Sequence, residues 1–289
     1  MRRQMPRELR GKYRLVCTPQ VCVNVSGNDF IYGGMDMSEK RVALVSGAAT
    51  GIGRDCSVQL AKDGFQMVLC DWNKEEGEKT LALCREQNVE ADFLEINMAV
   101  EEQAEKFIRF AAEKYGKIDF YFNNQGVIHM PKLFEDITEE DFDYVTNNNF
   151  KACFFGMKHA LRVMKKQGYG HLVNTGSSSG IRPETGFGVY SATKHAVIGL
   201  TKDAAIEMAK YGVRVNSVCP GGIITPLTIA VGKYMQEHQF VQPKASTALL
   251  GPARMGQTSE ITGVISFLAS EASSYMTGAI ISVDGGNTQ

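Results

Sequence analysis

A tyrosine and a lysine four residues apart, Tyr190 and Lys194, are well suited to proton transfer. Apolar residues recur at helical spacing through residues 197–211, which predicts that the pair opens a helix and shares one face of it. A free phenol has a pKa of about 10, and a neighbouring cation lowers that pKa. The pair therefore predicts a group that exchanges a proton with a substrate oxygen.

Ser177 lies upstream of this pair, just after an apolar run that ends near Thr175. If the run is a strand of a parallel sheet, its carboxyl end lies at the edge where ligands bind. A hydroxyl at that edge can hydrogen-bond the same substrate oxygen as Tyr190. Ser177 is therefore the second predicted catalytic residue.

Three glycines, Gly47, Gly51 and Gly53, directly follow the first apolar run and precede a helical segment that reaches about residue 62. Glycines let backbone amides approach a pyrophosphate, and a helix N-terminus adds unpaired N–H groups. A turn without a ligand would explain one glycine, but not three with small residues between them. The pattern predicts a dinucleotide site.

Asp71 ends the second apolar run, roughly 20 residues after the glycines, where a carboxylate can accept hydrogen bonds from a ribose and repel a 2′-phosphate. Neither Thr50 nor Trp72, from which a basic residue could bind that phosphate, is charged. NAD is therefore favoured over NADP. The alternative role for Asp71 is that of a helix cap or turn residue.

Seven short apolar runs alternate with segments of helical periodicity from residue 40 onward. This order predicts an α/β fold with right-handed crossovers, in which one doubly wound, seven-stranded parallel sheet carries helices on both faces. No linker or repeat interrupts it, so residues 39–289 are predicted to be a single domain. The predicted strands are 41–46, 66–70, 92–96, 118–122, 171–175, 213–218 and 279–283.

Composition excludes several classes of partner. The 31 basic residues balance 32 acidic ones, so no broad positive field attracts nucleic acid. No stretch approaches the roughly 20 apolar residues of a membrane span. The histidines show no ligand spacing, so no metal is expected. The cysteines contain no CxxC pair and indicate a reduced, cytoplasmic protein.

Residues 1–38 are rich in arginine and carry no recognisable chemistry. No apolar segment follows the arginines, as it would in a signal peptide. We expect a disordered leader, or translation from a start upstream of Met35 or Met37.

Taken together, the motifs resemble those of the short-chain dehydrogenase/reductase family, a single-domain Rossmann fold, over about residues 40–289. The glycine turn resembles the family's cofactor turn, and the segment that starts at Asn123 and ends at Gly126 resembles its NNAG motif. Ser177, Tyr190 and Lys194 match its catalytic group. The segment after Pro220 resembles the loop that embraces the nicotinamide.

This resemblance implies a fourth catalytic residue, Asn149, with Asn148 as the alternative if the helix register differs. Asn149 is expected to bend its helix and to hold a water that leads to Lys194. The resemblance also implies an extended set of cofactor-binding residues: Gly47, Thr50, Gly51, Ile52, Gly53, Asp71, Asn97, Met98, Asn124, Gly126, Tyr190, Lys194, Pro220, Gly221, Ile223 and Thr225.

Two positions depart from the family pattern. Gln125 replaces the alanine of NNAG and places a bulkier polar side chain beside the cofactor. Asn97 replaces the usual aspartate after the third strand, which retains a hydrogen-bonding group near the adenine and removes a charge.

The implied reaction is reversible hydride transfer between nicotinamide and a secondary alcohol or ketone. In it Ser177 orients the oxygen, Tyr190 exchanges its proton, and Lys194 lowers the phenol pKa and binds the ribose. An NAD enzyme favours alcohol oxidation. Residues 182–189 and 226–255 should select the small-molecule substrate, and the apolar residues of the second segment suit a hydroxysteroid or other cyclic alcohol.

Two alternatives remain. One is an NADPH-dependent ketoreductase similar to the 3-oxoacyl-carrier-protein reductases, for which Asp71 is an awkward feature. The other is a non-catalytic nucleotide-binding regulator, which would require a broken catalytic group. The resemblance also implies a homotetramer or homodimer, in which the helices that carry Asn149 and Tyr190 pack across a two-fold axis.

Overall fold

The computed structural model describes residues 15–17, 21–24, 30–32, 40–241 and 254–289. The chain divides into two units, residues 1–40 and 41–289. The larger unit contains a seven-stranded sheet in which all pairings are parallel, with strand order β10-β9-β8-β7-β4-β5-β6. The predicted fold is confirmed. The strands are β4 (Val42–Ser46), β5 (Gln66–Asp71), β6 (Ala91–Glu95), β7 (Phe120–Asn123), β8 (Gly170–Thr175), β9 (Val213–Pro220) and β10 (Ile280–Val283).

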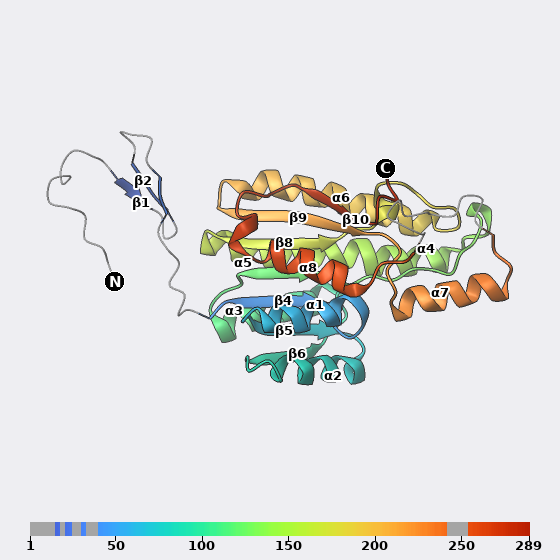
Figure 1. Ribbon diagram of the computed structural model, residues 1–289, viewed down its shortest axis with the longest axis horizontal. Coiled ribbons are helices and arrows are strands. Elements are labelled where there is room, and N and C mark those ends of the chain that lie inside the picture. Colours follow the sequence, from blue (N-terminus) through green and yellow to red (C-terminus); the bar gives the residue numbers. More distant parts are fainter. Residues whose placement is uncertain (1–14, 18–20, 25–29, 33–39, 242–253) are drawn as a thin grey trace. The chain divides into compact units, whose positions relative to one another are not determined.

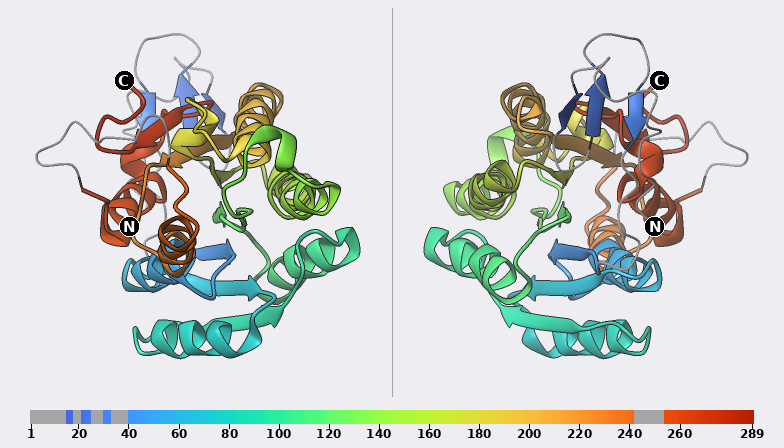
Figure 2. Two further views of the ribbon diagram at one scale, coloured as in Figure 1. Left: turned by 90° about the vertical axis from the view of Figure 1, so that its right-hand side faces the viewer. Right: turned by 90° about the vertical axis from the view of Figure 1, so that its left-hand side faces the viewer.

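Helices cover both faces of this sheet (Figure 2). Helices α3, α5 and α6 pack on one face, while α1, α2 and α8 pack on the other. The helices of the larger unit are α1 (Gly51–Lys62), α2 (Lys74–Arg85), α3 (Glu101–Tyr115), α4 (Glu139–Val145), α5 (Ala152–Gln167), α6 (Gly188–Ala209), α7 (Pro226–Glu237) and α8 (Thr258–Leu268).

The two hydrophobic cores follow from the alternation of side chains along each strand. In β4, Val42 and Leu44 belong to the core under α3 and α5, whereas Ala43 and Val45 belong to the core under α1 and α8. All five residues of β4 are buried. A strand that is apolar on both faces can only lie inside a sheet that is covered on both sides.

The seven predicted strands are all present, with ends shifted by one or two residues. Two ends are shifted by two residues: the fourth strand, predicted from Ile118, begins at Phe120, and the sixth, predicted to end at Val218, ends at Pro220. The Ile118 N–H donates to the Gln167 side chain at 2.8 Å and takes no part in the strand ladder.

Two features at the carboxyl ends of the strands prepare the site. Helices α4 and α7 lie beyond these ends (Figure 1). Helix α7 begins at a Thr225 cap, where Thr225 and Thr228 form a capping box and Pro226 takes the first helical position. Between α4 and α5 the chain forms a π-helix, η3 (Thr146–Lys151), which contains Asn149.

The smaller unit contains three short strands among its described residues, where the sequence had indicated no element. They form an antiparallel sheet of order β1-β2-β3. The strands are β1 (Leu15–Cys17), β2 (Val21–Asn24) and β3 (Phe30–Tyr32). That residues 1–38 are a leader apart from the catalytic domain stays a prediction.

Candidate active site

A cleft of about 440 Å³ opens at the carboxyl ends of β4 to β9. It gathers the glycine turn, Asp71 at the end of β5, the segments that follow β6 and β7, and the Tyr190 helix. Of the residues predicted from the sequence for cofactor binding and catalysis, Asn149 is the one that does not line this cleft. Segments far apart in the chain thus meet in one place.

The glycine turn has the close contacts that its residue types suggest. Gly47 and Gly51 have φ angles of 68° and 54°, which residues with a side chain rarely adopt. A Cβ on Gly53 would lie 1.9 Å from the Gly47 carbonyl oxygen, so helix α1 can approach the turn only without a side chain there. The turn therefore leads directly into the N-terminus of α1, where backbone N–H groups are unpaired.

Hydrogen bonds connect this turn to the lysine of the predicted catalytic group. The Asn124 side-chain amide donates to the Gly47 carbonyl oxygen at 3.1 Å, and its oxygen accepts from the Thr175 hydroxyl at 3.0 Å. The Lys194 ammonium then donates to the Thr175 carbonyl oxygen at 2.8 Å. Residues at the ends of β7 and β8 thus link the glycine turn to Lys194 through hydrogen bonds.

Tyr190 and Lys194 lie in the first turns of α6, with the lysine Nζ 5.6 Å from the centroid of the phenol ring. Lys194 is 4% exposed and Ser177 is 7% exposed. Ser177 comes directly before a short 3-10 helix, η4 (Ser178–Gly180), and its hydroxyl accepts from the Ser179 N–H at 3.1 Å. Ser177 is also a side-chain hydrogen-bond partner of Tyr190, and this bond lowers the pKa of the phenol.

The net pKa shift of Tyr190 is opposite to the one expected. Burial is the largest influence and raises the phenol pKa, while the hydrogen bond with Ser177 opposes it. Burial also lowers the pKa of Lys194 to about 8. Burial therefore outweighs the hydrogen bond with Ser177, and the lowering of the phenol pKa by Lys194 stays a prediction. In this state Tyr190 is protonated at neutral pH and can donate to a carbonyl oxygen.

Asn149 clamps a neighbouring loop. Its side chain is 1% exposed, accepts from the Val127 N–H at 2.7 Å and donates to the Val127 carbonyl oxygen at 2.9 Å. It also donates to the Thr193 hydroxyl at 3.2 Å. A Cβ on Gly126 would lie 3.3 Å from the Asn149 oxygen and 3.4 Å from the Lys194 Nζ, so both side chains approach the same loop. Asn148 instead lines the cleft.

Gln125, the departure from the family pattern, turns toward the end of β4. Its side-chain oxygen accepts a hydrogen bond from the Ser46 hydroxyl. Its Nε2 atom is buried and has no hydrogen-bond partner among the described residues. The substitution thus places a polar group against the sheet, under the glycine turn.

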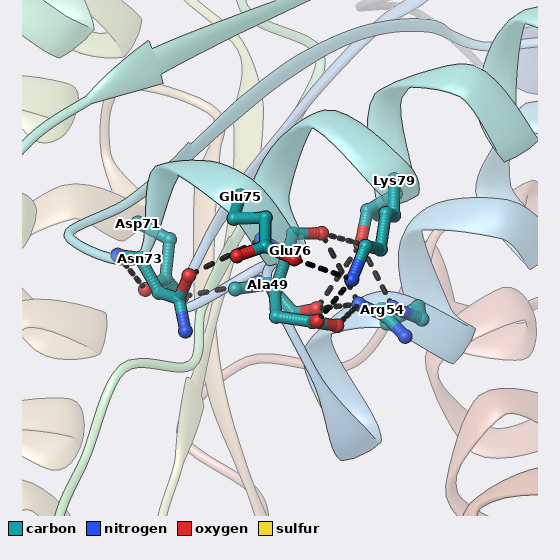
Figure 3. Close-up of polar contacts among 8 residues, drawn as sticks. Ala49, Arg54, Asp71, Asn73, Glu75, Glu76 and Lys79 are labelled. Atoms are coloured by element: carbon teal, nitrogen blue, oxygen red, sulfur yellow. Dashed lines mark hydrogen bonds and ion pairs between the residues drawn. The ribbon is translucent and has the colours of Figure 1, made fainter.

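A polar cluster lies at the far end of the cleft (Figure 3). Of its residues, the sequence analysis identified only Asp71. The Asp71 carboxylate accepts from the Ala49 N–H at 3.0 Å and from the Asn73 N–H at 2.9 Å. Asp71 is therefore a turn residue as well as a cleft residue. Behind it, Arg54 pairs with Glu76 at 2.6 Å. No sequence motif marks this pair, because the two residues come from different helices.

A larger cavity of about 880 Å³ continues from the cleft and shares Ser177 and Tyr190 with it. Both segments expected to select the substrate contribute to its wall. Leu249, one of the apolar residues of the second segment, lies outside the described residues. The contributing side chains are Glu184, Phe187, Leu227, Thr228, Val231, Met235, Arg254 and Met255.

Over residues 40–241 and 254–289, no group of three or more histidine, cysteine or acidic side chains is placed to hold a metal ion. No helix in the described part of the chain has the length and apolar character needed to cross a membrane.

Comparison with known proteins adds independent information. The profile of a family described as enoyl-(acyl carrier protein) reductase matches residues 47–288. Levodione reductase of Leifsonia aquatica is 34% identical over 251 residues, which cover 86% of this chain and 94% of that protein. The 3beta-hydroxysteroid dehydrogenase of Mediterraneibacter gnavus is 30% identical over 276 residues, covering 89% and 99%.

Solved structures agree with these matches. The crystal structure of levodione reductase superposes with a TM-score of 0.79 at 33% identity, covering 86% of this chain and 97% of that one. The 3-ketoacyl-(acyl-carrier-protein) reductase of Brucella melitensis, complexed with NADH, gives 0.77 at 27% identity over 87% and 99%. Actinorhodin polyketide ketoreductase with NADPH gives 0.80 at 29% identity over 88% and 100%. Similar structures thus include both cofactors.

Proposed function

Because the chain belongs to the short-chain dehydrogenase/reductase family of oxidoreductases, which act on CH–OH groups, we propose that it interconverts a secondary alcohol and a ketone with NAD. The observation that carries this proposal is that Ser177, Tyr190 and Lys194 line the same cleft as the glycine turn and Asp71. A proton-transfer group and a dinucleotide-binding turn at one sheet edge are what hydride transfer to a carbonyl requires.

The residues of the cleft fit a dinucleotide. A side chain on Gly47 or Gly53 would collide with neighbouring backbone, so the turn leaves its amides open at the start of α1. A bound nicotinamide supplies the hydride donor or acceptor. Lys194 binds the adjoining ribose, Ser177 orients the substrate oxygen, and Tyr190 exchanges its proton. Asn149 acts on this group through the Val127 loop.

The preference for NAD depends on Asp71. A ribose with free hydroxyls can donate to this carboxylate, whereas a 2′-phosphate would be repelled by it. Thr50 and Trp72, which also line this end of the cleft, provide no positive charge.

The substrate proposed is an apolar cyclic alcohol or ketone, with a hydroxysteroid as one candidate. The cavity beside Ser177 and Tyr190 is large, and Phe187, Val231 and Met235 contribute apolar wall to it. A levodione reductase and a hydroxysteroid dehydrogenase among the relatives agree with that class.

A panel of secondary alcohols, assayed with NAD by the absorbance of NADH, tests this function. We expect turnover of cyclic alcohols, and we expect Tyr190→Phe to reduce turnover by about 100-fold to 10,000-fold. The variant should retain its NAD affinity, since it loses one hydroxyl. A variant that keeps turnover would disprove the role of Tyr190, and a wild-type protein inert toward the whole panel would contradict the substrate class.

A second candidate is an NADPH-dependent reductase of 3-oxoacyl chains. The similarity to the Brucella melitensis protein favours that substrate, and the similarity to the polyketide ketoreductase with NADPH favours that cofactor. Initial rates with the two cofactors separate the candidates, because a tenfold or greater preference for NADPH would reject our choice. A regulator without turnover is disfavoured, since Ser177, Tyr190 and Lys194 are all present in the cleft.

We assign the protein to the cytoplasm and to a homotetramer or homodimer. The cysteines described in residues 40–241 and 254–289 are free, as in a reducing compartment. Phe142, Phe150 and Phe154 are 52%, 36% and 44% exposed along α4, η3 and α5, which supports burial of this surface against another copy. Light scattering coupled to size exclusion measures the mass, and a monomer at micromolar concentration would reject the assignment.

A further inference from the structure

An ion pair lies directly behind the wall of the cleft at its Asp71 end. The Arg54 guanidinium comes from the first turns of α1, and the Glu76 carboxylate comes from the first turn of α2. Nη2 of Arg54 contacts Glu76 Oε2 at 2.6 Å and donates to the Ala49 carbonyl oxygen, while Nε donates to the Thr80 hydroxyl at 3.0 Å. Arg54 therefore faces away from the cleft, and Ala49 lies between the guanidinium and the cleft.

Glu76 neutralises a second cation as well. Its other carboxylate oxygen contacts the Lys79 Nζ at 2.6 Å (Figure 3). These hydrogen bonds lower the pKa of Glu76, so the carboxylate is charged at neutral pH. The neighbouring Glu75 contacts Lys79 at 3.0 Å, and no contact with Arg54 is found for it. The two adjacent carboxylates thus share Lys79 and differ in their contact with Arg54, and Glu75 is the more exposed of the two.

Both members of the pair are one hydrogen bond from the cleft wall. Ala49, which accepts from Arg54, lines the cleft and donates its N–H to Asp71 at 3.0 Å. Asn73 also lines the cleft, and its side chain accepts from the Glu76 N–H at 3.2 Å. The charge of this cluster is therefore next to the site where Asp71 would meet a ribose.

We propose that Glu76 determines cofactor specificity as a positioning residue, by holding the guanidinium of Arg54 neutralised and turned away from the position of a 2′-phosphate. A guanidinium is the side chain best suited to bind phosphate through paired N–H donors. Without the Glu76 charge, Arg54 would be an unneutralised cation one hydrogen bond from Ala49, at the Asp71 end of the cleft. Asp71 excludes the phosphate by repulsion, and Glu76 withholds the group that would attract it. This inference rests on the proposed preference for NAD.

Calorimetric titration of the wild-type protein and of Glu76→Gln and Glu76→Ser with NAD and with NADP tests the proposal without any turnover. In both variants the NADP dissociation constant should fall by at least about tenfold (about 1.4 kcal/mol), and that for NAD should change by less than about twofold. Because two unpaired charges attract more strongly at low ionic strength, the gain should shrink in high salt. Emission of Trp72, the single tryptophan, gives a second readout, since this residue lines the same end of the cleft.

Glu75→Gln is the matched control, because it removes the same charge from the next residue without releasing Arg54. It should leave the ratio of the two dissociation constants within about threefold of wild type. Glu76→Asp keeps the charge and should keep the ratio. Adding Arg54→Met to Glu76→Gln should remove the gain for NADP. Thermal unfolding confirms that each variant is folded.

Equal effects of Glu76→Gln and Glu75→Gln, or none from either, would overturn the proposal. So would a gain that survives Arg54→Met, since another cation would then bind the phosphate. The wild-type titration is judged separately. Tighter binding of NADP than of NAD by the wild-type protein would reject the proposed cofactor preference, whatever the Glu76 variants do.

Discussion

Replacement of Asn149 by alanine should destabilise the whole domain as well as impair catalysis. The side chain makes two hydrogen bonds with the backbone of Val127, at 2.7 and 2.9 Å, in a place where Asn149 is 1% and Val127 is 7% exposed. Alanine would leave a buried N–H group and a buried carbonyl group without these partners. Each such loss costs about 1 to 3 kcal/mol, so the free energy of unfolding should fall by about 2 to 6 kcal/mol.

Urea denaturation followed by circular dichroism measures this change as a shift of the midpoint at constant slope. Asn148→Ala is the matched control for stability. The Asn148 amide donates to the Tyr144 carbonyl oxygen of the preceding turn at 2.8 Å, in an exposed setting. Its loss should cost less than about 1 kcal/mol.

Turnover distinguishes the clamp from the water-holding role that the family resemblance implies. A clamp predicts that Asn149→Ala loses stability and turnover together, because the Val127 loop next to Lys194 loses its support. A residue that only holds a water would lose turnover while its unfolding free energy stays at the level of the Asn148 variant. That second result would refute our interpretation of these contacts.

Three further predictions follow from single residues. Asp71→Ala should weaken NAD binding and improve NADP binding, as measured by titration. An unchanged ratio of the two dissociation constants would show that another residue determines the cofactor preference. Gly53→Ala places a Cβ 1.9 Å from the Gly47 carbonyl oxygen and should reduce cofactor affinity by more than about tenfold, whereas affinity equal to wild type would refute the close approach. Burial and Arg214 lower the pKa of His171 to about 3, so the folded state resists protonation. The contribution of His171 to the free energy of unfolding is therefore complete above its usual pKa near 6.5, and it is lost as the pH falls toward 3. Between pH 7 and 4.5 this group should lower the free energy of unfolding by about 2 to 3 kcal/mol. His171→Gln should abolish that loss, whereas the control His238→Asn, at an exposed histidine, should leave it unchanged.

The strands and the cofactor turn could be predicted because their signals are local. The apolar run before Gly47 and the glycine spacing depend on residues that are neighbours in the chain, so the sequence pattern carries them directly. The same holds for Tyr190 and Lys194, whose spacing places them on one helix face. The carboxyl-edge rule for parallel sheets then placed Ser177 beside them.

The sequence by itself determined the α/β alternation, the residue types at the site and their order along the chain. The tertiary structure decided the strand order, the sign of the Tyr190 pKa shift, the contact of Asn149 with Val127 and the pairing of Arg54 with Glu76. Each of these depends on burial, or on a partner distant in sequence. The desolvation of a group depends on every atom around it, and a contact between two helices depends on how both helices pack. A local sequence pattern therefore predicts neither of them.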